Sequence, residues 1–78
     1  STTIGYDIPK NAHVNVVIYD VLGRVVTTLV NEVKAASRHT VEWNASGVAT
    51  GVYFYRMTAK PVDGSRDFHA VKKLLLVK

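Results

Sequence analysis

Apolar and polar residues alternate along most of the chain with a period of two, the spacing of strands that bury one face. No stretch has the 3.6-residue period of an amphipathic helix. The alternating runs are separated by clusters of Pro, Gly, Asn, Asp and Ser, which favour turns. The pattern therefore predicts an all-β chain, an antiparallel β-sandwich of about six or seven short strands.

The alternating runs give the expected positions of the strands. They cover residues 2–8, 14–19, 24–30, 38–43, 52–59 and 66–77. The last run is long enough to hold a bulge or bend. Turns are expected at residues 9–12, 44–47 and 61–65, the last with an Asp-Gly hairpin signal. Residues 31–37 are expected to be a polar connection with room for a short helical turn.

The sharpest turn signal is Asp20-Val21-Leu22-Gly23, between two β-branched runs. An Asp carboxylate at the first turn position accepts hydrogen bonds from backbone N–H groups two residues on. Gly23 adopts a positive φ without steric cost, as a type I turn followed by a bulge requires. Val21 and Leu22 are not needed for this geometry. They either pack against a neighbouring loop, the favoured reading, or form a small apolar contact for a partner.

Inward-facing positions of the predicted strands define the expected core. It consists of Ile4, Tyr6, Val14, Val16, Ile18, Val26, Leu29, Val41, Trp43, Tyr53, Tyr55, Met57, Leu74 and Leu76. Tyr53, Phe54 and Tyr55 leave two readings, a platform for a sugar or a part of the core. Alternation sends Phe54 to the opposite face, so core packing of the two tyrosines is favoured.

Composition narrows the class of protein. With 78 residues, the chain is expected to be one domain, 1–78, that buries about 60% of its unfolded surface. It has no cysteine, and no apolar run approaches the roughly 20 residues that span a bilayer. A net charge of +4 without clustered basic residues and exposed aromatics does not predict nucleic-acid binding. Lys72, Lys73 and Lys78 fit an edge strand whose lysines discourage aggregation, although such an edge also allows a dimer.

Catalytic and metal-binding patterns are not found. There is no Gly-rich phosphate loop, nucleophile elbow or pair of catalytic carboxylates, so the chain is not predicted to be an enzyme. His13, His39 and His69 lie in three segments without metal-ligand spacing, and no metal or cofactor is predicted. Asn44-Ala45-Ser46 matches a glycosylation sequon, but a turn role for Asn44 is favoured.

Three blocks of sequence carry a resemblance to a known family. Residues 17–26 (VIYDVLGRVV), 43–56 (WNASGVATGVYFYR) and 73–78 (KLLLVK) resemble, in this order, blocks of type IX secretion C-terminal sorting domains. Residues 1–4 resemble the start of the first strand of that family. Each block alone is a weak signal, whereas the ordered set covers nearly the whole chain. Residues 31–37 depart from the family because they lack its usual Gly and Pro.

The resemblance implies an immunoglobulin-like sandwich at the C-terminus of a large secreted protein, mainly in Bacteroidetes. It implies recognition by an outer-membrane secretion translocon, processing by a surface peptidase or transferase, and an N-terminal cargo domain on the same polypeptide. The expected location is the cell surface of a Gram-negative bacterium. A related branch resembles the immunoglobulin-like domain of flagellar-hook capping proteins, so the fold alone does not fix the role.

Recognition of such a module depends on its surface and not on a reactive group. We expect the hairpin tip and the last strand to be read by the translocon. The candidate recognition residues are Asp20, Gly23, Arg24, Gly51, Tyr53, Lys73, Leu74, Leu76 and Lys78. Two alternatives stay open: an accessory carbohydrate-binding or adhesive module, which would expose coplanar aromatics, and a structural spacer without a partner.

Overall fold

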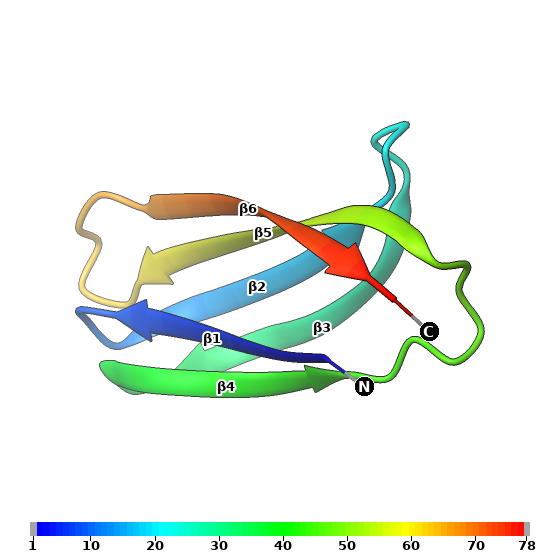
Figure 1. Ribbon diagram of the computed structural model, residues 1–78. Helices are drawn as coiled ribbons and strands as arrows, with labels where there is room; N and C mark the ends of the chain where they lie inside the picture. Colours follow the sequence, from blue (N-terminus) through cyan, green and yellow to red (C-terminus); the bar gives the residue numbers. More distant parts are fainter. Residues whose placement is uncertain (1, 78) are drawn as a thin grey trace.

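The computed structural model describes residues 2–77, which form six antiparallel strands and no helix. Figure 1 shows these strands as two facing sheets. One sheet has four strands in the order β3-β2-β5-β6, and the other pairs β1 with β4. The predicted all-β sandwich is confirmed, and its architecture is consistent with an immunoglobulin-like fold. The strands are β1 (Thr2–Ile8), β2 (Ala12–Tyr19), β3 (Val25–Lys34), β4 (Ser37–Trp43), β5 (Gly51–Pro61) and β6 (Phe68–Leu76).

The core lies between the two sheets and is centred on β2. This strand pairs with β3 on one side and β5 on the other. Its alternate residues are fully buried, as expected for a strand with one face against a core. Trp43 of β4 packs edge-on against Tyr53 of β5, with ring centroids 5.3 Å apart. This aromatic pair connects the sheets and buries a large apolar area in a small core.

Most of the predicted core residues are buried, and the remainder pack against the core. The half-buried ones are Val26, Leu29, Val41 and Leu74. The prediction omitted five buried residues: Ile8, Ala12, Val30, Ala45 and Ala59. Three of the five are alanines, whose small side chains give only a weak hydrophobic signal in the sequence.

Two bulges in β3 explain why Val26 and Leu29 are only half-buried. The β2–β3 register shifts between Val16 and Val17 and again between Ile18 and Tyr19, which leaves residues 29 and 26 of β3 without a direct partner. A bulge rotates the strand and changes the alternation of its side chains. The bulge considered for the last strand is not present, because the β5–β6 register runs without a shift.

The prediction of a polar connection over residues 31–37 was wrong. Strand β3 continues to Lys34 and β4 begins at Ser37, so only residues 35–36 connect these two strands, which belong to different sheets. The Ala36 N–H donates to Asn11 Oδ1 at 2.8 Å, which holds this corner. The end of β3 is polar because it is a sheet edge, where Lys34 Nζ lies 2.6 Å from Glu32 Oε1. Polar edge strands resemble loops in sequence.

Replacement of Ile18 by alanine tests the central position of β2. Its side chain is fully buried, so I18A is expected to lower the free energy of unfolding by about 2–5 kcal/mol. Val71 of β6 is 62% exposed, and V71A is the control, with a change within about 0.5 kcal/mol. Urea unfolding followed by tryptophan fluorescence measures both. Equal losses in the two variants would contradict the assigned core.

Candidate recognition surface at the hairpin tip

The turn between β2 and β3 is held by the backbone and side chain of Asp20. The Gly23 N–H donates to the Asp20 carbonyl at 3.0 Å, and the Asp20 N–H donates to the Arg24 carbonyl at 3.0 Å. Gly23 has a φ of +80°, the left-handed conformation that glycine adopts most easily. The predicted turn with a following bulge is therefore formed.

The carboxylate of Asp20 accepts three further hydrogen bonds. Oδ1 accepts from the N–H groups of Leu22 at 2.9 Å and Arg24 at 3.0 Å, while Oδ2 accepts from Arg24 Nε at 2.9 Å. The backbone N–H of Arg24 is the main cause that lowers the pKa of the Asp20 carboxyl, and the Arg24 side chain and Leu22 N–H add to it. The Arg24 side chain stays 73% exposed, so its other guanidinium nitrogens face solvent.

Val21 and Leu22 project from this turn into solvent. Their exposed fractions are 65% and 73%, so the favoured expectation that they pack against a neighbouring loop was wrong. In Figure 1 the hairpin extends beyond the body of the sandwich. The hydrogen bonds to Asp20 hold the turn, and the two apolar side chains stay exposed.

A hollow of about 270 Å³ lies between the turn and the start of β5. We call its lining residues the tip surface; they are Asp20, Val21, Leu22, Arg24, Thr50, Gly51, Val52 and Tyr53. The tip surface thus brings together four candidate recognition residues that lie in separate segments of the sequence: Asp20, Arg24, Gly51 and Tyr53. The Tyr53 hydroxyl donates to the Ala49 carbonyl at 2.6 Å, which fixes the wall of the hollow.

The end of β6 runs beside this start of β5. Leu76 lies opposite Gly51, and Leu74 lies opposite Tyr53. Leu76 is buried and Leu74 packs against the core, so alternation instead exposes Leu75 and Val77, by 70% and 73%. Sequence analysis missed these two residues, although strict alternation from the inward-facing Leu74 would have indicated Leu75. Lys73 lies opposite Phe54, and the candidate Lys78 lies outside the described residues.

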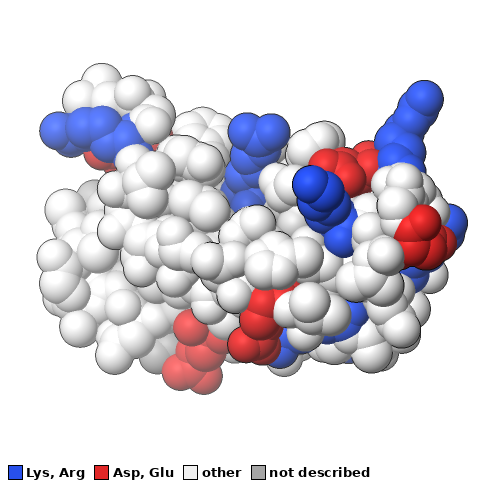
Figure 2. Space-filling view, turned by 180° about the vertical axis from the view of Figure 1, so that it is seen from behind, with Lys and Arg blue, Asp and Glu red and all other residues white. Residues whose placement is uncertain are grey.

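The two ends of the molecule differ in character. Figure 2 shows the back of the sandwich, where the surface below the hairpin tip, on the left, has few charged side chains. At the opposite end, Lys10 Nζ donates to Ser65 Oγ at 2.7 Å and lies 3.4 Å from Asp63 Oδ2. The Val62 N–H donates to the Asn11 carbonyl at 3.0 Å. At the tip, exposed apolar side chains therefore lie beside a hollow. At the other end, hydrogen bonds join the loops.

The three histidines lie apart from one another. The histidines do not meet, since His13 bonds Asn31, His39 bonds the Ala35 carbonyl and His69 bonds Thr58. Within residues 2–77 no three potential metal ligands form a group, and no helix is long and apolar enough to cross a membrane.

Two further predictions, the turn at Asn44 and core packing of Tyr53 and Tyr55, are confirmed. The Ser46 N–H donates to Asn44 Oδ1 at 3.2 Å, the turn that was favoured for Asn44. Tyr53 and Tyr55 are buried, so they do not form an exposed platform for a sugar.

Comparison with known proteins places the chain in a family. A profile described as the secretion system C-terminal sorting domain matches residues 1–74. The chain belongs to this family. The sorting domain is a C-terminal signal for type IX secretion, and the protein that carries it is exported by that system. The matched segment includes the complete tip surface. No curated protein and no solved structure matches the chain.

Stability is expected to depend on pH through Asp20 of the sorting domain. Because the folded-state pKa is lowered, its contribution is present above the unfolded pKa of about 3.9 and is lost as pH falls through the lower folded value. D20N should be less stable than the parent at pH 7, and the difference should shrink below about pH 4. E42Q is the control, because Glu42 forms no ion pair in residues 2–77. Urea midpoints across pH measure the effect, and a pH-independent difference for D20N would contradict it.

Proposed function

We propose that the outer-membrane translocon of type IX secretion reads the tip surface together with the exposed end of β6. The observation that supports this most is the convergence of Asp20, Arg24, Gly51 and Tyr53 on one hollow. These residues come from two separate sequence blocks, and the fold places them beside two projecting apolar side chains.

The chemistry of the tip surface is suited to contact with a protein. Interfaces are anchored by a few apolar, aromatic or arginine side chains that lose water on binding. Leu22 provides an exposed aliphatic anchor, and the Arg24 guanidinium provides a directional cation fixed on one side by Asp20. Since the turn is already ordered by hydrogen bonds, binding costs little further conformational entropy.

The proposal extends to the later steps of sorting. A surface peptidase or transferase would act once the domain has reached the exterior of a Gram-negative cell, and the cargo would be an N-terminal domain of the same polypeptide. The domain itself is assigned no catalytic residue, metal or cofactor. Its contribution is a stable surface, and the chemistry belongs to its partners.

Charge introduced at the hairpin tip tests the main claim. A reporter fused to residues 1–78 and expressed in a bacterium with type IX secretion should reach the medium or cell surface. L22E should lower this delivery by on the order of tenfold, because a buried carboxylate in the interface lacks a partner. V62E is the control, since Val62 is 61% exposed at the opposite end. Delivery of L22E equal to that of V62E would exclude the tip surface as the recognised site.

The end of β6 needs a variant that keeps the core intact. Deletion of residues 74–78 is expected to abolish delivery, but it also removes Leu76 from the core. The double variant L75E/V77E changes side chains that are exposed and leaves Leu74 and Leu76 in place. It should impair delivery while its urea midpoint stays near that of the parent. Normal delivery of the double variant would show that the side chains at the end of β6 are not read.

A further inference from the structure

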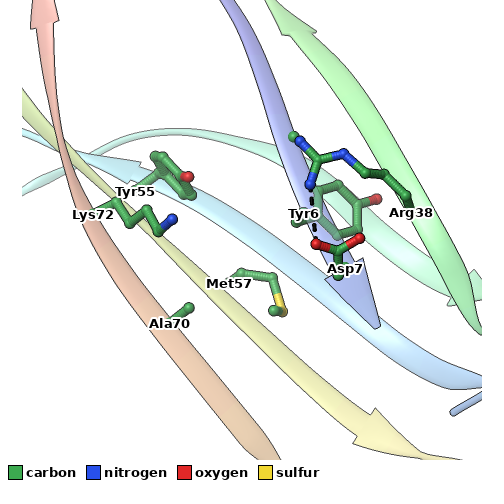
Figure 3. Close-up of a pocket in the computed structure, with 8 residues that line it drawn as sticks. Tyr6, Asp7, Arg38, Tyr55, Met57, Ala70 and Lys72 are labelled. Atoms are coloured by element: carbon green, nitrogen blue, oxygen red, sulfur yellow. Dashed lines mark hydrogen bonds and ion pairs between the residues drawn. The ribbon is translucent and has the colours of Figure 1, made fainter. Parts of the chain in front are cut away.

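The four-stranded sheet is wider than the two-stranded sheet that covers it. Part of its inner face therefore lines an open hollow of about 250 Å³ beside β1, shown in Figure 3. We call this hollow the seam. Its lining residues are Gly5, Tyr6, Asp7, Arg38, Tyr55, Met57, Ala70 and Lys72. They come from β1 and β4 on one side and from β5 and β6 on the other.

One edge of β1 faces this hollow without a partner strand. In the described part of the chain, β1 pairs with β4 alone, over the full length of seven residues. The free edge carries backbone N–H and C=O groups of the kind that pair with an added strand. A third strand of the small sheet would lie beside β1 and over Tyr55 and Met57, which belong to the core with 8% and 4% of their surface exposed. The seam thus has both a backbone template and an apolar floor.

The charges around the seam are unbalanced. Arg38 Nη1 lies 3.0 Å from Asp7 Oδ2, so that this carboxylate is already paired. Gly5 makes room for this pair, because a Cβ atom there would collide with the Arg38 guanidinium. On the opposite wall, the Lys72 side chain points toward the hollow in Figure 3, and it has no ion pair within residues 2–77. The uncompensated charge is therefore positive.

We propose that an extended acidic segment of a partner protein adds to the free edge of β1 as a third strand. Its backbone pairs with the free edge of β1, its apolar side chains enter the hollow lined by Tyr55 and Met57, and a carboxylate pairs with Lys72. The position of Lys72 supports this choice, because it stands on the inner face of β6 between Ala70 and Leu74. This site is distinct from the tip surface, and neither proposal depends on the other.

A second copy of the chain fits the seam less well. Its β1 carries a single carboxylate, Asp7, which Arg38 already occupies. Its β6 would bring Lys72 and Lys73 toward a surface that is already positive. Like charges placed directly opposite across a strand pair are destabilising. Charge complementarity thus favours an acidic heterologous strand.

The competing explanation for Lys72 is protection of an edge strand. An inward-pointing lysine on such a strand prevents sheet-to-sheet aggregation without binding any partner. Lys73 is the matched control, because it is adjacent in sequence but lies on the outer face, opposite Phe54. A role in binding requires the two lysines to differ in their effect on an acidic peptide, whereas edge protection does not.

The test is titration of the ¹⁵N-labelled chain with a capped peptide of alternating valine and glutamate, with a valine–lysine peptide for comparison. The acidic peptide should shift amide resonances of β1 and of the seam side of β5 and β6. K72E should weaken its binding by about tenfold and K73E by less than about twofold. Unchanged binding of both peptides by L22E would confirm that the seam acts independently of the tip surface.

Four outcomes would overturn the proposal. These are the absence of saturable shifts, equal affinity for both peptides, equal loss in K72E and K73E, and shifts that map outside the seam. Sedimentation equilibrium of the free chain adds a fifth: a dimer abolished by K72E would show that a second copy fills the seam. Urea unfolding of K72E verifies that the variant is folded, since Lys72 is exposed and its replacement removes no core packing.

Discussion

The structure depends on one strand that is hydrogen-bonded along both edges and buried on one face. Strand β2 hydrogen-bonds to β3 and β5, and its inner residues Ala12, Val14, Val16 and Ile18 are fully buried. No slip of one residue is tolerated, because it would move every one of these side chains to the solvent face. The positions of both neighbouring strands, and hence of the turn that follows β2, are set by this requirement.

The tip and the seam are two consequences of that arrangement. The tip lies where the β2–β3 hairpin extends past the body of the sandwich, so Val21 and Leu22 stay mostly exposed. The seam lies where four strands face two. At the tip apolar side chains remain exposed, and at the seam the outer edge of β1 has no partner strand in the described part of the chain. Binding to a surface that is already ordered costs little conformational entropy.

The sequence predicted the fold class and most strands because alternation is a local signal. It located the turn at Asp20 and Gly23 for the same reason, since the carboxylate and the glycine act within five residues. It did not predict the continuation of β3 to Lys34, because an edge strand with polar residues reads as a loop. It also predicted that Val26 and Leu29 are buried, whereas they are half-buried. The two bulges responsible arise from pairing with β2 and have no signal in the sequence of β3.

The candidate site likewise combines features that follow from local sequence with features that only tertiary pairing sets. Asp20, Arg24, Gly51 and Tyr53 were selected from separate blocks, and only the pairing of β2 with β5 brings them to one hollow. Exposure of Leu75 follows from alternation, whereas the openness of the seam follows from the number of strands in each sheet. Sequence patterns predict which face a side chain takes, and tertiary pairing decides what covers that face.

The pairing of β1 with β4 also has a kinetic consequence. Ile8 and Ser37 are direct partners, yet the whole β2–β3 hairpin lies between them in the chain. Closing so long a loop costs entropy that a local hairpin does not pay, and non-local pairing slows folding. We therefore expect the hairpin to form early and the two-stranded sheet to dock late. During assembly the inner face of the large sheet passes through a stage in which it is open to solvent, and the chain is then most exposed to aggregation or to capture by a chaperone.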